Sequence, residues 1–247
     1  MFLAVDIGNS CIKNAVFDGD NITFGSIPRM KENIGYYKNT YTSAFGGADI
    51  TSCAIISVVN GMDEMIKAVC DELFGIESVI LCAEDAKEIK IKPDCIGQVG
   101  MDRVANVYGV IDSPLPAIVV DIGTAVTFDI LSQGREFLGG AIMPGVNMQL
   151  KALSDGTSKL FEVKPQESPS AIGNDTETCI LSGVVRGIAS AIDGLLEQTA
   201  KELGGCKTII LTGGQAELVS KYMKTKADID KKHTVSGIRR LYCAIEG

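Results

Sequence analysis

The stretch Leu3–Ser10 reads LAVDIGNS, and Ile118–Ala125, about halfway along the 247-residue chain, reads IVVDIGTA. Each is an apolar run rich in β-forming residues that ends in Asp-Ile-Gly and a small polar residue. This pattern is typical of a buried strand followed by a tight turn, in which we expect the glycine to adopt a positive φ. The repeat predicts that the chain contains a duplicated unit.

A second pair of similar stretches supports the duplication. Ala54–Gly61 resembles Thr208–Gln215, and a helical pattern follows each. Two related halves, each opening with a hairpin whose turn exposes backbone N–H groups and an aspartate, would form a cleft for a polyphosphate and its cation. This arrangement resembles the actin, sugar-kinase and Hsp70 group of phosphotransferases. The predicted fold class is α/β, with two duplicated actin-like (ribonuclease H-like) ATPase domains and a cleft between them.

Two prolines mark the predicted boundary between the halves. Ser113–Pro116 cannot continue the helix predicted at Val104–Ile111, and it lies just before the second repeated strand. We therefore expect an N-terminal actin-like ATPase half at residues 1–115 and a C-terminal half at residues 116–247.

The amino-acid composition limits the kinds of molecule that the protein is expected to bind. The formal net charge is −8 and the sequence pI is about 4.8, which disfavours an electrostatic grip on nucleic acid or anionic lipid. No apolar run approaches the roughly 20 residues that span a bilayer, and the N-terminus leads directly into a strand. We expect a cytoplasmic protein that binds neither nucleic acid nor a membrane.

Cysteine and histidine usage argues against metal or triad chemistry. The eight cysteines form no CxxC pair and lie near no histidine cluster, so we expect them to be reduced and mostly buried. His233 is the only histidine, and the polar run Lys231–His233 is typical of a solvated loop. A Ser-His-Asp or multi-histidine site is therefore not favoured.

Hydrophobic periodicity predicts the remaining elements. Strands are expected at 2–7, 12–18, 22–27, 55–59, 78–81, 117–122, 125–131 and 135–138, and helices near 62–74, 104–111, from 146, and from 176 to 203. Asn174 is the candidate N-cap of the last helix, with Glu177 completing a capping box. Residues 29–51 are polar and weakly periodic. Gly183 and Gly187 interrupt the last helix, which either reflects close approach of another helix, within the chain or across a dimer, or is accidental.

The first repeated turn carries residues suited to ATP. Gly8 lets the backbone approach an anion, Asn9 and Ser10 add short donors, and Lys13 lies on the following strand within reach of a phosphate. Asp6 would repel phosphate, so it suits a hydrated Mg²⁺ that bridges the nucleotide. The alternative is an aspartate that caps the turn with its own side chain.

The nucleotide would be held without a common phosphate motif. The sequence contains neither GxxxxGK[ST] nor GxGxxG after a strand. Gly213 and Gly214, after the strand that ends at Thr212, offer a surface without side chains against which adenosine could lie. A simple strand-to-helix turn would also explain these glycines.

Six motifs, in order, resemble the type III pantothenate kinases over nearly the whole chain. They are Asp6–Ser10 (DIGNS), Gly100–Arg103 (GMDR), Asp121–Ala125 (DIGTA), Gly139–Gly145 (GGAIMPG), Gly173–Thr176 with Ser182 and Gly183, and Thr212–Gly214 (TGG). The resemblance implies ATP-dependent phosphorylation of pantothenate to 4′-phosphopantothenate, the first step of coenzyme A biosynthesis.

The resemblance also implies roles for matching residues. Asp6–Lys13 and Thr124 would bind ATP, and Gly100, Met101, Asp102 and Arg103 would bind pantothenate, with Asp102 as the catalytic base. Asp121 would hold a monovalent cation, K⁺ or NH₄⁺, and Thr176 would contact pantothenate in the neighbouring subunit of a homodimer. A carboxylate can accept the hydroxyl proton during phosphoryl transfer, and an arginine suits the carboxylate of pantothenate. The alternative for Asp102 is an acid favoured by the helix dipole.

The chain departs from the family at several positions. Lys90–Val99 is longer than usual and lacks the substrate-binding tyrosine and the Asn-Pro found there, Asn60 replaces a frequent proline, and Gly173–Thr176 varies the usual Gly-x-Asn-Thr. Two alternatives therefore stay open. The protein could be a kinase of the same fold that acts on another small hydroxyl or carboxylate substrate, or a non-catalytic regulatory relative.

Overall fold

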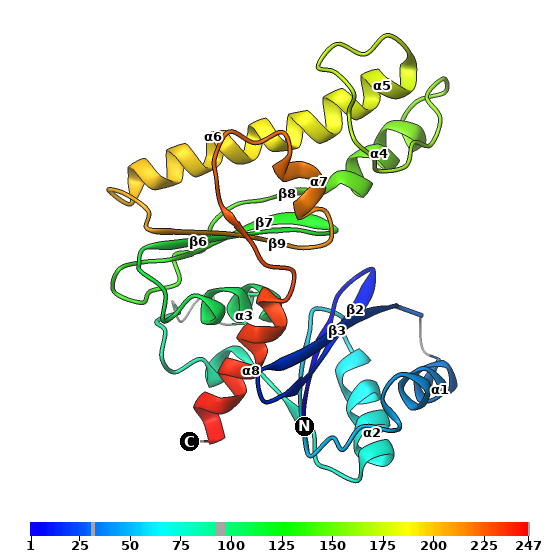
Figure 1. Ribbon diagram of the computed structural model, residues 1–247, viewed down its shortest axis with the longest axis vertical. Helices are drawn as coiled ribbons and strands as arrows, with labels where there is room; N and C mark the ends of the chain where they lie inside the picture. The colour runs from blue at the N-terminus through cyan, green and yellow to red at the C-terminus, as the bar shows by residue number, and fades with distance from the viewer. Residues whose placement is uncertain (31–32, 92–96, 247) are drawn as a thin grey trace. The chain divides into compact units, whose positions relative to one another are not determined.

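The computed structural model describes residues 1–30, 33–91 and 97–246, which form two compact units (Figure 1). The first unit joins Met1–Ile111 to the residues from Lys232 onward, and the second is Asp112–Lys231. Each unit is an α/β structure built on a five-stranded mixed sheet.

The two sheets have the same topology. The first runs in the order β3-β2-β1-β4-β5 and the second β8-β7-β6-β9-β10. The strands are β1 (Phe2–Ile7), β2 (Cys11–Asp18), β3 (Asn21–Pro28), β4 (Ser52–Ser57), β5 (Val79–Ile80), β6 (Ala117–Ile122), β7 (Ala125–Leu131), β8 (Ile142–Pro144), β9 (Thr208–Thr212) and β10 (Asp228–Ile229). In each sheet the first strand pairs antiparallel with the second and parallel with the fourth. The predicted duplication is confirmed, since both pairs of similar stretches occupy equivalent strands.

Helices cover both sheets. The first unit contains α1 (Ile34–Phe45), α2 (Met62–Phe74), the 3₁₀ turn η1 (Ala83–Asp85), α3 (Met101–Gly109) and α8 (His233–Glu246). The second contains α4 (Val146–Asp155), α5 (Thr176–Leu181), the π-helical turn η3 (Ser182–Arg186), α6 (Gly187–Glu202) and α7 (Ala216–Ser220). Each unit has its own apolar core, centred on the strands Leu3–Ile7 in the first and Ile118–Ile122 in the second.

Helix α8 changes the predicted division of the chain. It packs against α3, β1 and β4, so the last residues belong to the first compact unit rather than to a C-terminal half at 116–247. The expectation that His233 lies in a solvated loop is wrong, because His233 begins α8 and is buried. Its burial depends on helices that are far apart in the sequence.

Other local predictions are corrected by tertiary context. Helix α1 occupies residues without clear periodicity, and its buried residues are the aromatic Tyr37 and Tyr41. The strand predicted at 135–138 is reduced to one bridge between Leu131 and Phe137. The N-cap of α5 is Asp175 rather than Asn174, because the Asp175 carboxylate accepts the Thr178 N–H at 2.8 Å.

One helical stretch, Thr176–Glu202, is by length and composition alone apolar enough to cross a membrane. Polar residues interrupt this stretch, so the sequence alone predicted no run long enough to span a bilayer. Its polar groups have partners within the second unit: Arg186 donates to Ser168, and Asp193 accepts backbone N–H groups of the segment that follows α7. Core helices of soluble proteins pass the same test, so the stretch is weak support for a membrane span.

Gly183 and Gly187 have no close neighbour in this chain. Among the described residues, no atom outside their own helical surroundings lies within 4 Å of a Cβ built at either position. Close approach by another helix of the same chain therefore does not explain them.

Candidate functional site

The first group of candidate site residues lies at the turn between β1 and β2. The strand register places Asp6 opposite Lys13, and the Lys13 Nζ lies 3.3 Å from the Asp6 Oδ2. Asp6 is only 3% exposed. A carboxylate buried to this degree needs a compensating charge, which the ammonium group supplies.

Gly8 and Gly123, the glycines of the two repeated turns, are needed because a side chain would not fit there, and not because their backbone adopts a conformation that only glycine tolerates. The predicted positive φ is wrong, since neither Gly8 nor Gly123 lies in that region. A Cβ at Gly8 would instead lie 3.1 Å from the Cys11 carbonyl oxygen. The same oxygen accepts a hydrogen bond from the Gly8 N–H, and this bond closes the turn. A Cβ at Gly123 would lie 3.3 Å from the Asp121 Oδ1.

Arg29, which was not among the predicted site residues, also holds the first turn. Its Nε donates to the Asn9 carbonyl at 2.8 Å, and its backbone N–H donates to the Ser10 carbonyl at 3.2 Å. The pairing of Pro28 with Cys11 puts the next residue beside the turn, so a correct hairpin register would have revealed it. Arg29 places a second positive charge near Asn9 and Ser10.

The start of α3 presents Asp102 and Arg103. Gly100 is the N-cap residue, and the Arg103 N–H donates to the Asp102 Oδ1 at 2.8 Å. A Cβ at Gly100 would lie 2.5 Å from the same oxygen, so only glycine leaves room for this carboxylate position. Met101 is buried beneath, while Asp102 and Arg103 stay half-buried.

The first sheet brings these two groups to one edge. The Val58 N–H donates to the Ile7 carbonyl at 3.1 Å, just beyond the carboxyl ends of the parallel strands β1 and β4. The Val58 side chain also lies 3.4 Å from the Cβ position of Gly100. The turn after Asp6 and the start of α3 therefore lie at the same edge, within one unit.

The second sheet forms an equivalent edge with different chemistry. The register places Asp121 beside Thr127 on β7 and Thr212 on β9, where the first unit has Lys13 opposite its aspartate. The Thr212 Oγ1 is buried and has no hydrogen-bond partner among the described residues. Hydroxyl and carboxylate oxygens are the donors that hard cations prefer.

Glycines close this second edge. Gly213 has a φ of +93°, and a Cβ there would collide with the Asp121 Oδ1. The Gly145 N–H donates to the Thr124 carbonyl at 3.0 Å, which ties the turn to the start of α4. Asp121, Thr124, Gly213 and the exposed Gly214 are thus gathered within the second unit.

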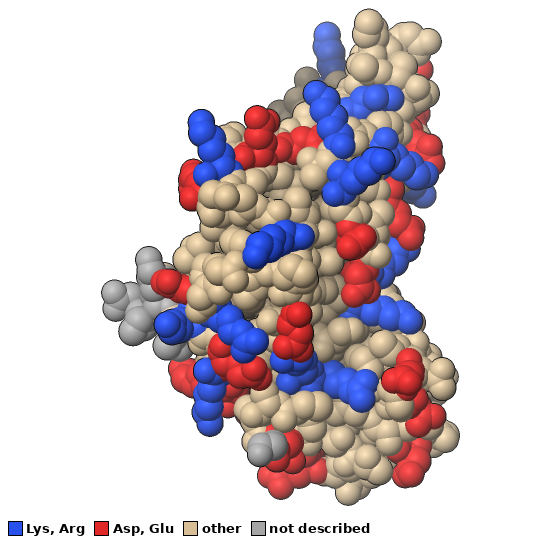
Figure 2. All heavy atoms as spheres, turned by 60° about the vertical axis from the view of Figure 1, so that its left-hand side comes forward, with Lys and Arg blue, Asp and Glu red and all other residues tan. Residues whose placement is uncertain are grey.

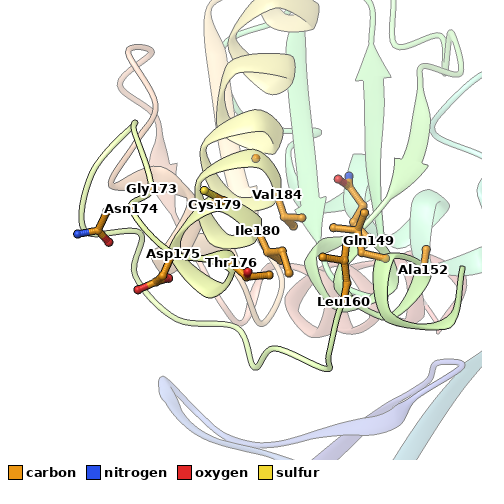
Figure 3. A pocket seen from close by; sticks show the side chains of 12 residues that line it. Gln149, Ala152, Leu160, Gly173, Asn174, Asp175, Thr176, Cys179, Ile180 and Val184 are labelled. Carbon is orange, nitrogen blue, oxygen red and sulfur yellow. The ribbon is translucent and has the colours of Figure 1, made fainter. Parts of the chain in front are cut away.

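Thr176 lies apart from that edge, on the wall of a cavity of about 990 Å³ in the second unit (Figure 3). Ile180 and Val184 face Gln149 and Leu160 across it, and none of the Asp121, Thr124 and Gly213 groups lines it. The Asp175 side chain points away from the cavity in this view. The Thr178 backbone N–H, followed by its hydroxyl, lowers the pKa of the Asp175 carboxyl below its usual value.

Two of the sequence predictions concern residues that the structure does not describe. Lys92–Ile96, within the stretch that departs from the family, lies outside the described residues, as does Cys95. The seven described cysteines are free thiols. They include the buried Cys53 and Cys70 but also the exposed Cys82, Cys179 and Cys243, so burial is less general than predicted.

Solved structures of other proteins share this fold. A Campylobacter jejuni protein assigned to the Baf family of transcriptional activators superposes with a TM-score of 0.63 at 23% identity, covering 99% of this chain and 98% of the other. A ROK hexokinase from Thermus thermophilus gives 0.51 at 13% identity, covering 99% of both chains. The predicted fold class is confirmed: the chain has the two-domain α/β fold of the actin-like sugar kinases and ATPases.

Sequence comparison gives the family. The family model for type III pantothenate kinases matches residues 2–198. Type III pantothenate kinases from Roseiflexus castenholzii and Desulfatibacillum aliphaticivorans are 31% and 32% identical, each alignment covering 98% of both chains. The chain belongs to the type III pantothenate kinase family, whose members phosphorylate pantothenate for coenzyme A biosynthesis.

The crowding at Gly100 generates a prediction. Gly100→Ala should keep the fold but displace the Asp102 carboxylate, since that flexible side chain can yield. Misplacing a reacting group by about 1 Å lowers turnover by roughly a hundredfold or less. Gly97→Ala, where nothing lies within 4 Å of the Cβ, is the matched control and should retain activity. Pantothenate turnover and thermal unfolding of both variants measure this, and equal turnover would contradict it.

Proposed function

We propose that this chain transfers the γ-phosphoryl group of ATP to the primary hydroxyl of pantothenate through the edge of its first sheet. The observation that carries the proposal is that Val58 contacts both Ile7, beside the Asp6–Lys13 turn, and Gly100, at the start of the helix that carries Asp102 and Arg103. A proton acceptor and a carboxylate-binding cation thus lie next to a turn suited to phosphate.

The residues then have defined tasks. Asp102 accepts the hydroxyl proton while the hydroxyl oxygen bonds to the γ-phosphorus and the bond to the departing ADP breaks. Arg103 binds the carboxylate of pantothenate, and Gly100 and Met101 complete the substrate-binding element. Lys13 and the turn at Gly8, Asn9 and Ser10 bind the ATP phosphates, helped by Thr124, with Gly213 and Gly214 against the adenosine.

Two cations fit the residues present. Asp6, buried beside one ammonium group, is placed to hold Mg²⁺ through water, which would neutralise phosphate charge. Asp121, flanked in register by Thr127 and Thr212, offers oxygen donors to K⁺ or NH₄⁺, and the buried Thr212 hydroxyl supports a cation there. The charge of a monovalent ion would offset a carboxylate near phosphates.

The proposed enzyme is a cytoplasmic homodimer without nucleic-acid or membrane partners. The net charge of −8 supports the proposed lack of nucleic-acid and anionic-membrane partners, as do the acidic and basic side chains interspersed on the face in Figure 2. Thr176, exposed on the cavity wall, would contact pantothenate bound by the partner subunit. Cell fractionation should recover the protein in the soluble fraction.

An acceptor panel tests the reaction. Purified protein with ATP, Mg²⁺ and K⁺ should phosphorylate pantothenate but not acetate or sugars, as read by product mass. Asp102→Asn should lower turnover by about 10² to 10⁴ while ATP binding persists, because the amide loses the proton acceptor but keeps the shape. Phosphorylation of another acceptor would support the kinase of different specificity. No product from any acceptor, with ATP bound, would support the regulatory relative.

Cation titrations separate the two aspartates, each serving as the control for the other. Asp6→Asn should raise the Mg²⁺ requirement and be partly rescued by excess Mg²⁺, with its K⁺ dependence unchanged. Asp121→Asn should lose activation by K⁺ and keep the wild-type Mg²⁺ dependence. Equal wild-type rates in sodium and potassium buffers would contradict the role given to Asp121.

Subunit mixing tests the shared site. Asp102→Asn and Thr176→Trp should each lower turnover strongly, yet mixtures of the two should regain activity, because one site in each heterodimer receives intact Asp102 and Thr176. Confirmed subunit exchange without activity, or a monomer in sedimentation, would overturn the shared site. Thr157→Trp, near the cavity but outside its lining, is the control for bulk and should stay active.

A further inference from the structure

The only histidine of the sequence caps the end of α3, the helix whose first turn carries Asp102. His233 is 4% exposed, and its Nε2 lies 2.9 Å from the Asn106 backbone carbonyl. Because a carbonyl only accepts, the Nε2 carries the proton and donates. At this end of α3 the Val110 N–H donates to the Val107 carbonyl and not to that of Asn106. The His233 Nε2–H therefore satisfies the Asn106 carbonyl in the last helical turn.

Thr234 contacts the side chain of the same asparagine. Its Oγ1 donates to the Asn106 Oδ1 at 2.9 Å, and the two residues are 2% and 1% exposed. Two successive residues of α8 therefore bind both the backbone and the side chain of Asn106. Buried polar groups that are satisfied in this way fix one arrangement of the elements that carry them.

The helices also approach too closely to slide. A Cβ at Gly109 would lie 2.6 Å from the His233 Cε1, and a Cβ at Gly237 would overlap the Ala105 carbonyl. These contacts leave α8 a single register along α3. Asn106 lies four residues after Asp102, one turn along the same face of α3.

The network lies where the chain passes between its units. The chain leaves the first unit after Ile111, two residues beyond the end of α3, and returns at Lys232, directly before His233. Lys231 pairs with Glu217 of the second unit at 2.8 Å, whereas the Lys232 Nζ donates to the Ile22 carbonyl of the first at 3.2 Å. The first passage therefore begins shortly after Asn106, and the second ends directly before His233.

We propose that His233, Asn106 and Thr234 are positioning residues that hold α3, and with it Asp102, in place against movements transmitted through the two passages. The proposal rests on the proposed function, in which Asp102 is the base. Many enzymes close loops or domains on their substrate, and a catalytic group must stay within about 0.5 Å of its working position. Anchoring the end of α3, beside the points where the chain leaves and re-enters the first unit, would keep such movement from displacing Asp102 at the start of the helix.

Thr234→Val tests the network because it keeps the shape and removes the hydroxyl. Turnover should fall roughly ten- to a hundredfold, with the KM for ATP unchanged, since the ATP turn lies on other elements. Thr234→Ser keeps a hydroxyl and should retain turnover. Thr40→Val is the matched control: it loses a hydrogen bond to the Tyr36 carbonyl in the same unit, away from α3, and should keep wild-type turnover.

A double mutant shows whether the effect passes through Asp102. In an Asp102→Asn background, Thr234→Val should lower the residual turnover no further, because the group being positioned is already lost. Hydrogen exchange gives a readout without turnover: the Arg103 and Val104 amides should exchange faster in Thr234→Val than in Thr40→Val.

The outcomes separate this inference from the proposed function. Wild-type turnover in Thr234→Val, the same fall in the Asp102→Asn background, or unchanged exchange at Arg103 and Val104 would each overturn the positioning role. If instead Asp102→Asn keeps full activity, the proposed base is wrong, and the exchange measurement alone decides whether the network holds α3.

Discussion

An aspartate at the end of the first strand of each sheet, with a turn closed tightly against it, is the constraint on which the site depends. A carboxylate removed from water is costly unless a cation or several donors compensate it. In the first unit the register supplies Lys13 opposite Asp6. In the second it supplies the hydroxyls of Thr127 and Thr212 beside Asp121.

The two units therefore share a topology and differ in chemistry. Equivalent strands carry equivalent aspartates, but one unit adds cationic side chains, Lys13 and Arg29, and the other adds oxygen donors and glycines. The first combination suits phosphate with a hydrated divalent ion, and the second suits a weakly hydrated cation. The same topology thus carries two different sets of side chains at equivalent edges.

Helix α3 connects the chemistry to the architecture. Its first turn presents Asp102 and Arg103, and its last turn is bound by His233. The same helix ends two residues before the chain leaves the first unit. The position of the proposed proton acceptor and the proposed anchoring beside the two passages therefore both depend on a single short helix.

The sequence by itself determined the duplication, the strands around each DIG turn and the family, because these depend on local patterns: apolar runs, turn residues and motif order. It also indicated the residues of the candidate site. Only the tertiary structure placed Arg29 at the first turn, assigned α8 to the first unit and buried His233, since each depends on residues far apart in the chain. The role of Gly8 was likewise decided by packing. The carbonyl oxygen of Cys11, at the start of β2, excludes a side chain at position 8, whereas the φ of Gly8 does not require glycine.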